Sequence, residues 1–173
     1  MAYSLHDLCV GQYLRTLGAV EGFLGKGLTH CTAAGVDPDS LVAARLAPDM
    51  LPLAFQIASV AHHSKGAIEG ARGGVFTPPN QPMPQTYAEL QAMVADARSA
   101  LEAVTPDEIN GLAGGDVVFE IGPRKLPFTV EGFLLSFSLP NFYFHAATAY
   151  DLLRANGVPL GKRDFLGQMA MKG

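Results

Sequence analysis

FLLSFSLPNFYFHAATAYDLL, from Phe133 to Leu153, is the longest stretch of the chain that is almost free of charge. Its middle nevertheless holds Asn141 and His145, which lie four residues apart and therefore on one face of a helix. The same face carries Leu134, Phe137, Thr148 and Leu152. This stripe predicts a helix whose polar pair faces the core. Both polar groups need partners, because an unsatisfied buried polar group costs about 1–3 kcal/mol.

The length and composition of the chain indicate one compact domain. With 173 residues, the chain is long enough to bury a real core, and we expect a single domain over residues 1–173. Apolar residues make up 49% and charged residues 16%, a balance that favours a well-filled fold with little disorder. The net charge of -4 and the lack of a Lys/Arg cluster argue against a nucleic-acid or anionic-membrane partner.

Cysteine usage and the N-terminal residues point to the cytoplasm. Cys9 and Cys31 fall in the first predicted helix, about 33 Å apart at helical rise, so they cannot pair within it. Two lone thiols favour a reducing compartment. The first residues lack the pattern of a signal peptide. Pro140, Asn141 and His145 make the apolar run a buried bundle helix rather than a membrane span.

Capping patterns and apolar spacing predict four long helices. They are expected at residues 4–35, 48–71, 86–104 and 130–155, with a short helix at 37–45. Capping boxes at Ser4–Asp7 and Thr86–Glu89 open the first and third. Several glycines in the first helix suggest a neighbour packed close to its backbone.

Two irregular segments connect these helices. The proline-rich residues 75–85 predict an extended connection. Residues 117–121 and 126–129 predict a β-hairpin, in which Pro127 confines the second strand to an edge. We therefore expect an all-α fold, a four-helix bundle with a small β-hairpin before the last helix.

The candidate chemistry lies between the second and fourth long helices. A metal site in a bundle core is built from side chains on facing helices. Here the second helix offers His62 and His63, and the fourth offers Asn141 and His145. Adjacent residues of a helix point about 100° apart, so only one of His62 and His63 faces inward. Apolar spacing along the second helix leaves that choice open.

A second interpretation needs no metal. The histidines are then satisfied core or cleft residues, and Asn141 caps backbone carbonyls that a kink at Pro140 would free. The exposed aromatic and aliphatic positions around the last helix also favour a homodimer surface.

The last predicted helix resembles that of the DinB-like (YfiT-like) metalloenzyme superfamily. The stretch HAATAYDLLRANG places His145 at the second of two family histidines and Asn141 at the first, with His62 or His63 as the third ligand. A closer resemblance is to a DinB-related family of unknown function, carried by ARLAPDMLPLAFQIA, SKGA, FSLPNFYFH and AYDLLRANGVPLGKRDFLG. This second resemblance covers nearly the full chain.

The resemblance implies a divalent metal such as zinc, nickel or iron, and a thiol-dependent transferase or hydrolase. Asn141 departs from the family pattern, because a neutral carbonyl oxygen is a poorer ligand than an imidazole nitrogen for such metals. Three hypotheses follow. The protein is a metal-dependent enzyme, a non-catalytic bundle that binds a small ligand, or a structural dimer whose His/Asn pair is a degenerate, metal-free site.

Overall fold

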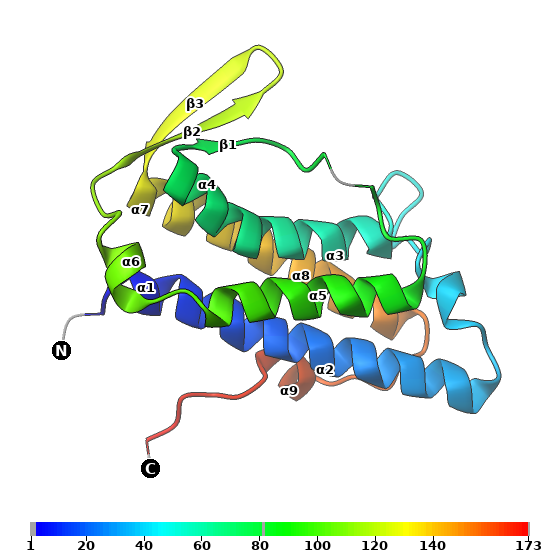
Figure 1. The fold of residues 1–173 in the computed structure, drawn as a ribbon. Coiled ribbons are helices and arrows are strands. Elements are labelled where there is room, and N and C mark those ends of the chain that lie inside the picture. The colour runs from blue at the N-terminus through cyan, green and yellow to red at the C-terminus, as the bar shows by residue number, and fades with distance from the viewer. Residues whose placement is uncertain (1–2, 81, 173) are drawn as a thin grey trace.

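The computed structural model describes residues 3–80 and 82–172. It is mostly helical, with a small three-stranded sheet at one end (Figure 1). The α-helices are α1 (Leu5–Leu8), α2 (Val10–Ala34), α3 (Leu53–Ala61), α4 (Ala67–Gly73), α5 (Tyr87–Glu102), α6 (Pro106–Asn110), α7 (Val130–Gly132), α8 (Leu139–Ala155) and α9 (Lys162–Leu166). The other helical segments are the 3₁₀-helix η1 (Pro38–Leu41) and the π-helices η2 (His62–Gly66) and η3 (Phe133–Ser138). The strands are β1 (Val75–Phe76), β2 (Asp116–Ile121) and β3 (Arg124–Thr129).

The long helices pack side by side along one axis. Helix α2 contacts α5 and α8, and α3 contacts α8 and α5. Figure 1 shows that α3, η2 and α4 form one continuous rod above α5, with the sheet at its α4 end. The fully buried aromatic side chains lie between these helices: Tyr13, Phe23, Tyr87, Phe133 and Phe142.

Most predicted helix ends are confirmed. Ser4 and Thr86 each form a capping box with the residue three positions on. Gly35 and Gly74 end α2 and α4 in the left-handed region, at φ 66° and φ 72°.

The start of one predicted helix and the length of another were wrong. The helix expected from residue 48 begins at Leu53, because the preceding residues form turns in which Met50 N donates to the Ala47 carbonyl. The short helix expected over residues 37–45 is only the 3₁₀-helix η1, capped by Asp37. Proline and turn residues lie in both places, and a local pattern does not fix where regular helix resumes.

Both helices that carry the candidate residues contain a π-helical segment, which the sequence did not predict. Segment η2 follows α3 at His62, and η3 precedes α8. Pro140 lies in the first turn of α8, where its missing N–H is best tolerated. The distortion near the proline is therefore a π-helix before it.

The sheet has the order β1-β2-β3. Strands β2 and β3 are antiparallel, with Val118 opposite Pro127, and Pro127 lies on an edge strand as expected. The proline-rich connection begins with an unexpected element, because Val75 and Phe76 form β1 parallel to β2. Phe76 is thereby held against η2 and η3.

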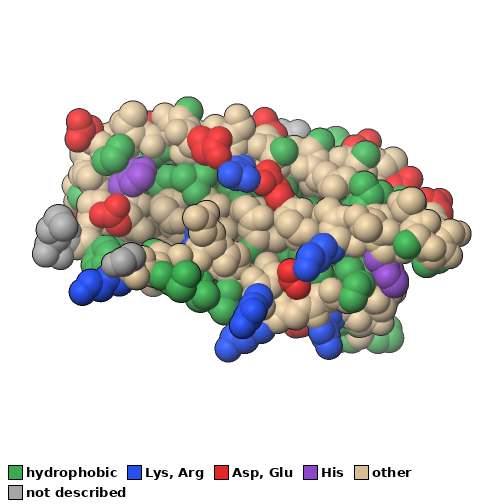
Figure 2. Space-filling model, turned by 90° about the horizontal axis from the view of Figure 1, so that it is seen from below, with side chains coloured by type: hydrophobic (Ala, Val, Ile, Leu, Met, Phe, Trp, Pro, Cys, Tyr) green, Lys and Arg blue, Asp and Glu red, His purple; other side chains and the backbone are tan. Residues whose placement is uncertain are grey.

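The last segment returns to the helices, as the sequence predicts. Helix α9 packs on α2, and Lys26 Nζ lies 2.6 Å from Asp164 Oδ1. On the face seen from below (Figure 2), most acidic side chains lie toward one long edge and most basic ones toward the other, with some of each sign among the opposite charges. Among the described helices, none combines the length and hydropathy needed to cross a bilayer.

One glycine of α2 explains why a neighbour approaches its backbone. A Cβ added at Gly27 would overlap the hydroxyl of Tyr87, which donates a 2.8 Å hydrogen bond to the Leu24 carbonyl. At Gly18, Gly22 and Gly25 nothing lies within 4 Å of such a Cβ. The close approach of α5 to α2 thus requires glycine at one position rather than several.

We predict that Gly27→Ala lowers the free energy of unfolding by about 1–3 kcal/mol, because the added methyl overpacks the α2–α5 contact. The matched Gly22→Ala should raise it by up to about 1 kcal/mol through helix propensity alone. In a Tyr87→Phe background, Gly27→Ala should lower the free energy of unfolding by a smaller amount. Urea unfolding of the unmodified chain, the two glycine variants, Tyr87→Phe and the Tyr87→Phe/Gly27→Ala double variant measures this. Equal costs of Gly27→Ala in both backgrounds would contradict the contact.

Candidate functional site

One serine hydroxyl joins the two π-helical segments, and a second serine hydroxyl bonds a carbonyl of its own helix. A π-helix leaves some carbonyls without the partner that an α-helix would provide, and such carbonyls need another donor. The buried hydroxyl of Ser64 donates to the Val60 carbonyl at 2.7 Å. The hydroxyl of Ser138, at the end of η3, donates to the His63 carbonyl at 2.8 Å. The backbone carrying the candidate histidines is therefore anchored to the helix that carries Asn141 and His145.

This arrangement resolves which histidine faces inward. The His63 ring lies nearly parallel to the His145 ring, at 15° and with centroids 5.9 Å apart. The His62 ring points to the other side and stacks on Phe76, at 26° and 4.4 Å. Of the four predicted site residues, the structure brings His63 and His145 together, on facing helices, and separates His62 from His145.

His145 has a partner that the sequence analysis missed. Its Nδ1 lies 2.8 Å from Oε1 of Gln56, and the Gln56 amide nitrogen donates to the Leu51 carbonyl at 2.9 Å. Because an amide oxygen only accepts, His145 Nδ1–H is the donor. Gln56 is only 3% exposed, so this hydrogen bond satisfies a buried amide.

Asn141 is satisfied within its own helix. Its Nδ2 donates to the Phe137 carbonyl at 2.7 Å. Asn141 therefore caps a carbonyl next to the distorted segment, as one of the two sequence interpretations expected. His63 differs from Asn141 and His145, because its buried Nδ1 has no hydrogen-bond partner among the described residues.

All three histidines favour the neutral form. Burial, together with the neighbouring His62 and His145 rings, lowers the pKa of His63 to about 3. Burial also lowers the pKa of His145 to about 4. For His62, burial lowers the pKa while the Thr77 carbonyl and Glu69 partly oppose the shift.

The side chains do not fit the metal site that the resemblance implies. A zinc site uses at least three protein ligands, usually imidazole, thiolate or carboxylate. Within residues 3–80 and 82–172, no three His, Cys, Asp or Glu side chains gather as such a group. His62 bonds the Thr77 carbonyl instead, and Asn141 adds only a neutral amide. A metal-dependent enzyme role is therefore not supported.

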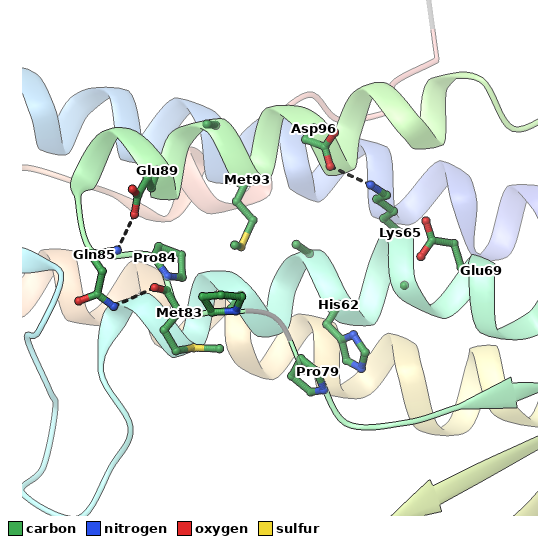
Figure 3. Close-up of a pocket in the computed structure, with 15 residues that line it drawn as sticks. His62, Lys65, Glu69, Pro79, Met83, Pro84, Gln85, Glu89, Met93 and Asp96 are labelled. Atoms are coloured by element: carbon green, nitrogen blue, oxygen red, sulfur yellow. Dashed lines mark hydrogen bonds and ion pairs between the residues drawn. The ribbon is translucent and has the colours of Figure 1, made fainter.

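A cleft opens beside His62, Lys65 and Gly66 of η2. Its volume is about 660 Å³, and it lies between the α3–η2–α4 rod and α5, beneath the proline-rich segment (Figure 3). Apolar side chains make much of its wall, among them Ala61, Met83, Ala92 and Met93. A second cleft of about 310 Å³ shares His62, Gly66, Glu69 and Pro79 with the first.

The charged groups of the cleft are unequally engaged. Lys65 Nζ lies 2.9 Å from Asp96 Oδ2, which bridges η2 and α5. Glu89 caps α5, where its Oε2 accepts from Gln85 N at 2.6 Å (Figure 3). Glu69 makes no ion pair or hydrogen bond with the described residues. His62 donates from Nε2 to the Thr77 carbonyl at 2.8 Å, so its Nδ1 stays an acceptor.

Sequence reasoning missed several of these residues. Gln56 is one polar residue in an apolar helix, and Phe76 was assigned to an irregular connection. A glutamine buried on the face of α3 would have been a usable signal, because a buried amide requires a partner. The cleft depends on how the proline-rich segment crosses η2 and α5, and no local pattern predicts that crossing.

Comparisons with known proteins agree with the resemblance noted above. The family model described as domain of unknown function (DUF1993) matches residues 5–166. The structure is similar to the crystal structure of a DinB family member from Shewanella denitrificans, with 29% identity and a TM-score of 0.83. That match covers 98% of this chain and 95% of the other, and it confirms the predicted DinB-like resemblance. A search of curated proteins found no match.

We predict opposite effects when His63 and His145 are each replaced by phenylalanine. His63→Phe removes a buried, unpartnered nitrogen from an aromatic environment, so stability at pH 7 should hold or rise. His145→Phe leaves the buried Gln56 oxygen without its donor and should cost about 1–3 kcal/mol. Denaturant unfolding measures both, and a large loss in His63→Phe alone would contradict the assigned hydrogen bonds.

The depressed histidine pKa values predict acid sensitivity. Between the unfolded pKa of about 6.5 and the folded values, the unfolded chain binds more protons, so the free energy of unfolding falls as pH falls. Each histidine changes the free energy of unfolding by at most about 1.4 kcal/mol per pH unit. The change is smaller here because both rings are partly accessible to solvent. Unfolding curves between pH 7 and 5 should show this loss, with a shallower slope in His63→Phe. A flat profile would contradict it.

Proposed function

The chain belongs to the family described as domain of unknown function DUF1993, and we propose that it binds a small ligand, without catalysis, in the cleft beside His62. The observation that carries this proposal is the cleft itself. Its volume of about 660 Å³ lies within the range of small-molecule sites, roughly 300–1,000 Å³. Its wall combines apolar side chains with a few polar groups, which is the usual composition of such sites.

The state of the polar groups supports binding rather than chemistry. The inward histidine pair is neutral and packed among aromatic rings, and His145 is occupied by Gln56. We propose that His63, Asn141 and His145 form a degenerate, metal-free site that supports the helix on which His62 lies. The methionines favour a ligand site of adaptable shape, because their side chains are flexible and polarisable.

We further propose the scaffold and partners that the sequence predicts. The packing of α2, α3, α5 and α8 supports a single-domain four-helix bundle, with β2 and β3 as its hairpin. Phe144, 59% exposed on α8, supports a homodimer, and a monomeric mass in light scattering would contradict that proposal. The net charge of -4, and the face in Figure 2 where basic groups are accompanied by acidic ones, support neither nucleic acid nor membrane as a partner.

We predict that Ala92→Phe abolishes ligand binding while the fold is kept. Ala92 is an exposed residue of α5 that lines the cleft, so a phenyl ring there fills the space without entering the core. Ala95→Phe is the matched control, since it is exposed on the same helix outside the cleft. A small-molecule library is tested by thermal shift against the purified protein and both variants.

The expected hits raise the melting temperature of the protein and of Ala95→Phe, but not of Ala92→Phe, and a chelator leaves the shifts unchanged. A library without any hit would contradict the proposed function. Elemental analysis that finds one bound metal per chain, lost in His145→Ala, would instead favour the metal-dependent enzyme.

A further inference from the structure

We infer that the ligand of this cleft is a protonated primary amine with an apolar body, bound through Glu69 and His62. The inference rests on the proposed function, because it names the chemical class of ligand for the same cleft. It starts from two groups at the wall shared by the two clefts, Nδ1 of His62 and the Glu69 carboxylate, which have no hydrogen-bond partner among the described residues.

The charge of the cleft favours a cation. Three carboxylates, Glu69, Glu89 and Asp96, face a single lysine. Lys65 and Asp96 neutralise each other, and Glu89 is engaged at the start of α5. Glu69 has no ion pair or hydrogen bond among the described residues, although it lies close enough to Lys65 to help raise the pKa of that amine. Three carboxylates against one lysine leave the wall with a net negative charge, which favours a cationic ligand.

His62 favours a cation that carries a hydrogen-bond donor. Nε2–H of His62 donates a hydrogen bond to the Thr77 carbonyl, which leaves Nδ1 as an acceptor. His62, Gly66 and Glu69 follow one another at four and three positions, so they share one face of the helix. The Glu69 carboxylate is near enough to oppose the effect of burial on the pKa of His62. A primary ammonium donates to both acceptors, whereas a quaternary ammonium has no N–H to donate.

Gly66 keeps the wall open for this contact. A Cβ at residue 66 would lie 3.0 Å from Nδ1 of His62 and would crowd the ring that Phe76 holds by stacking. An apolar body can be accommodated as well, because Met83 and Met93 lie in the part of the cleft away from Glu69 (Figure 3). The two halves of the cleft thus match the two halves of an amphipathic amine.

The test uses three compounds with one apolar body: phenethylamine, phenethyl alcohol and phenethyltrimethylammonium. NMR titration of the full chain should show the amine binding at least about tenfold more tightly than either other compound, with shifted signals from residues of the cleft. Glu69→Gln should weaken amine binding about tenfold and leave alcohol binding unchanged. Asp151→Asn, an exposed carboxylate on α8, is the matched control and should change neither. Added salt should weaken the amine alone.

The outcomes separate this inference from the proposed function. If amine and alcohol bind equally and both are lost in Ala92→Phe, the cleft binds small ligands but the amine assignment is overturned. If the amine binds preferentially but Glu69→Gln has no effect, the assignment of Glu69 is overturned. If none of the three compounds binds while a library hit still depends on Ala92, the amine class is wrong. If the library also yields nothing, both proposals fail.

Discussion

One hydrogen bond between two distorted helices determines the geometry around the histidines. The Ser138 hydroxyl, at the end of η3, donates to the His63 carbonyl in η2, and it satisfies a carbonyl that a π-helix leaves without its usual partner. The bond joins the two π-segments at His63, the residue that follows His62 in η2. Without the π-turn, the residues beyond it would face different neighbours, so the interior pair and the outer cleft both depend on this contact.

The same helical turn separates two chemical environments. On the inner side, His63 lies beside His145 among aromatic rings, and Gln56 holds His145 by a hydrogen bond. On the outer side, His62 stacks on Phe76 and keeps an acceptor nitrogen at the wall of the cleft. Burial makes charge unfavourable inside, whereas outside the Glu69 carboxylate has no ion pair with the described residues. Recognition of a polar ligand is therefore better placed on the outer side.

Features that depend on neighbouring residues were predictable from the sequence, and those that depend on distant contacts were not. The capping boxes at Ser4 and Thr86 and the edge position of Pro127 follow from local stereochemistry. The π-turns have no such signature, because they accommodate packing between η2 and η3. The partner of His145 lies 89 positions away, and the pairing of β1 with β2 joins residues 75–76 to 118–119. Periodicity alone could not decide between His62 and His63, since the π-turn interrupts the period.

Asn141 shows why the interior is better understood as structure than as a metal centre. Where the resemblance places a histidine, this chain has an amide that donates to the Phe137 carbonyl one turn earlier. That bond satisfies the amide without a cation, and Gln56 does the same for Nδ1 of His145. A cation would gain two buried imidazoles and one neutral oxygen, which is less than the ligand set that divalent transition metals usually require. The buried Nδ1 of His63 has no hydrogen-bond partner among the described residues, and aromatic rings that disfavour charge surround it. The residues that complete this site thus act as hydrogen-bonded supports, and the unused polar groups lie on the face of the helix that opens to the cleft.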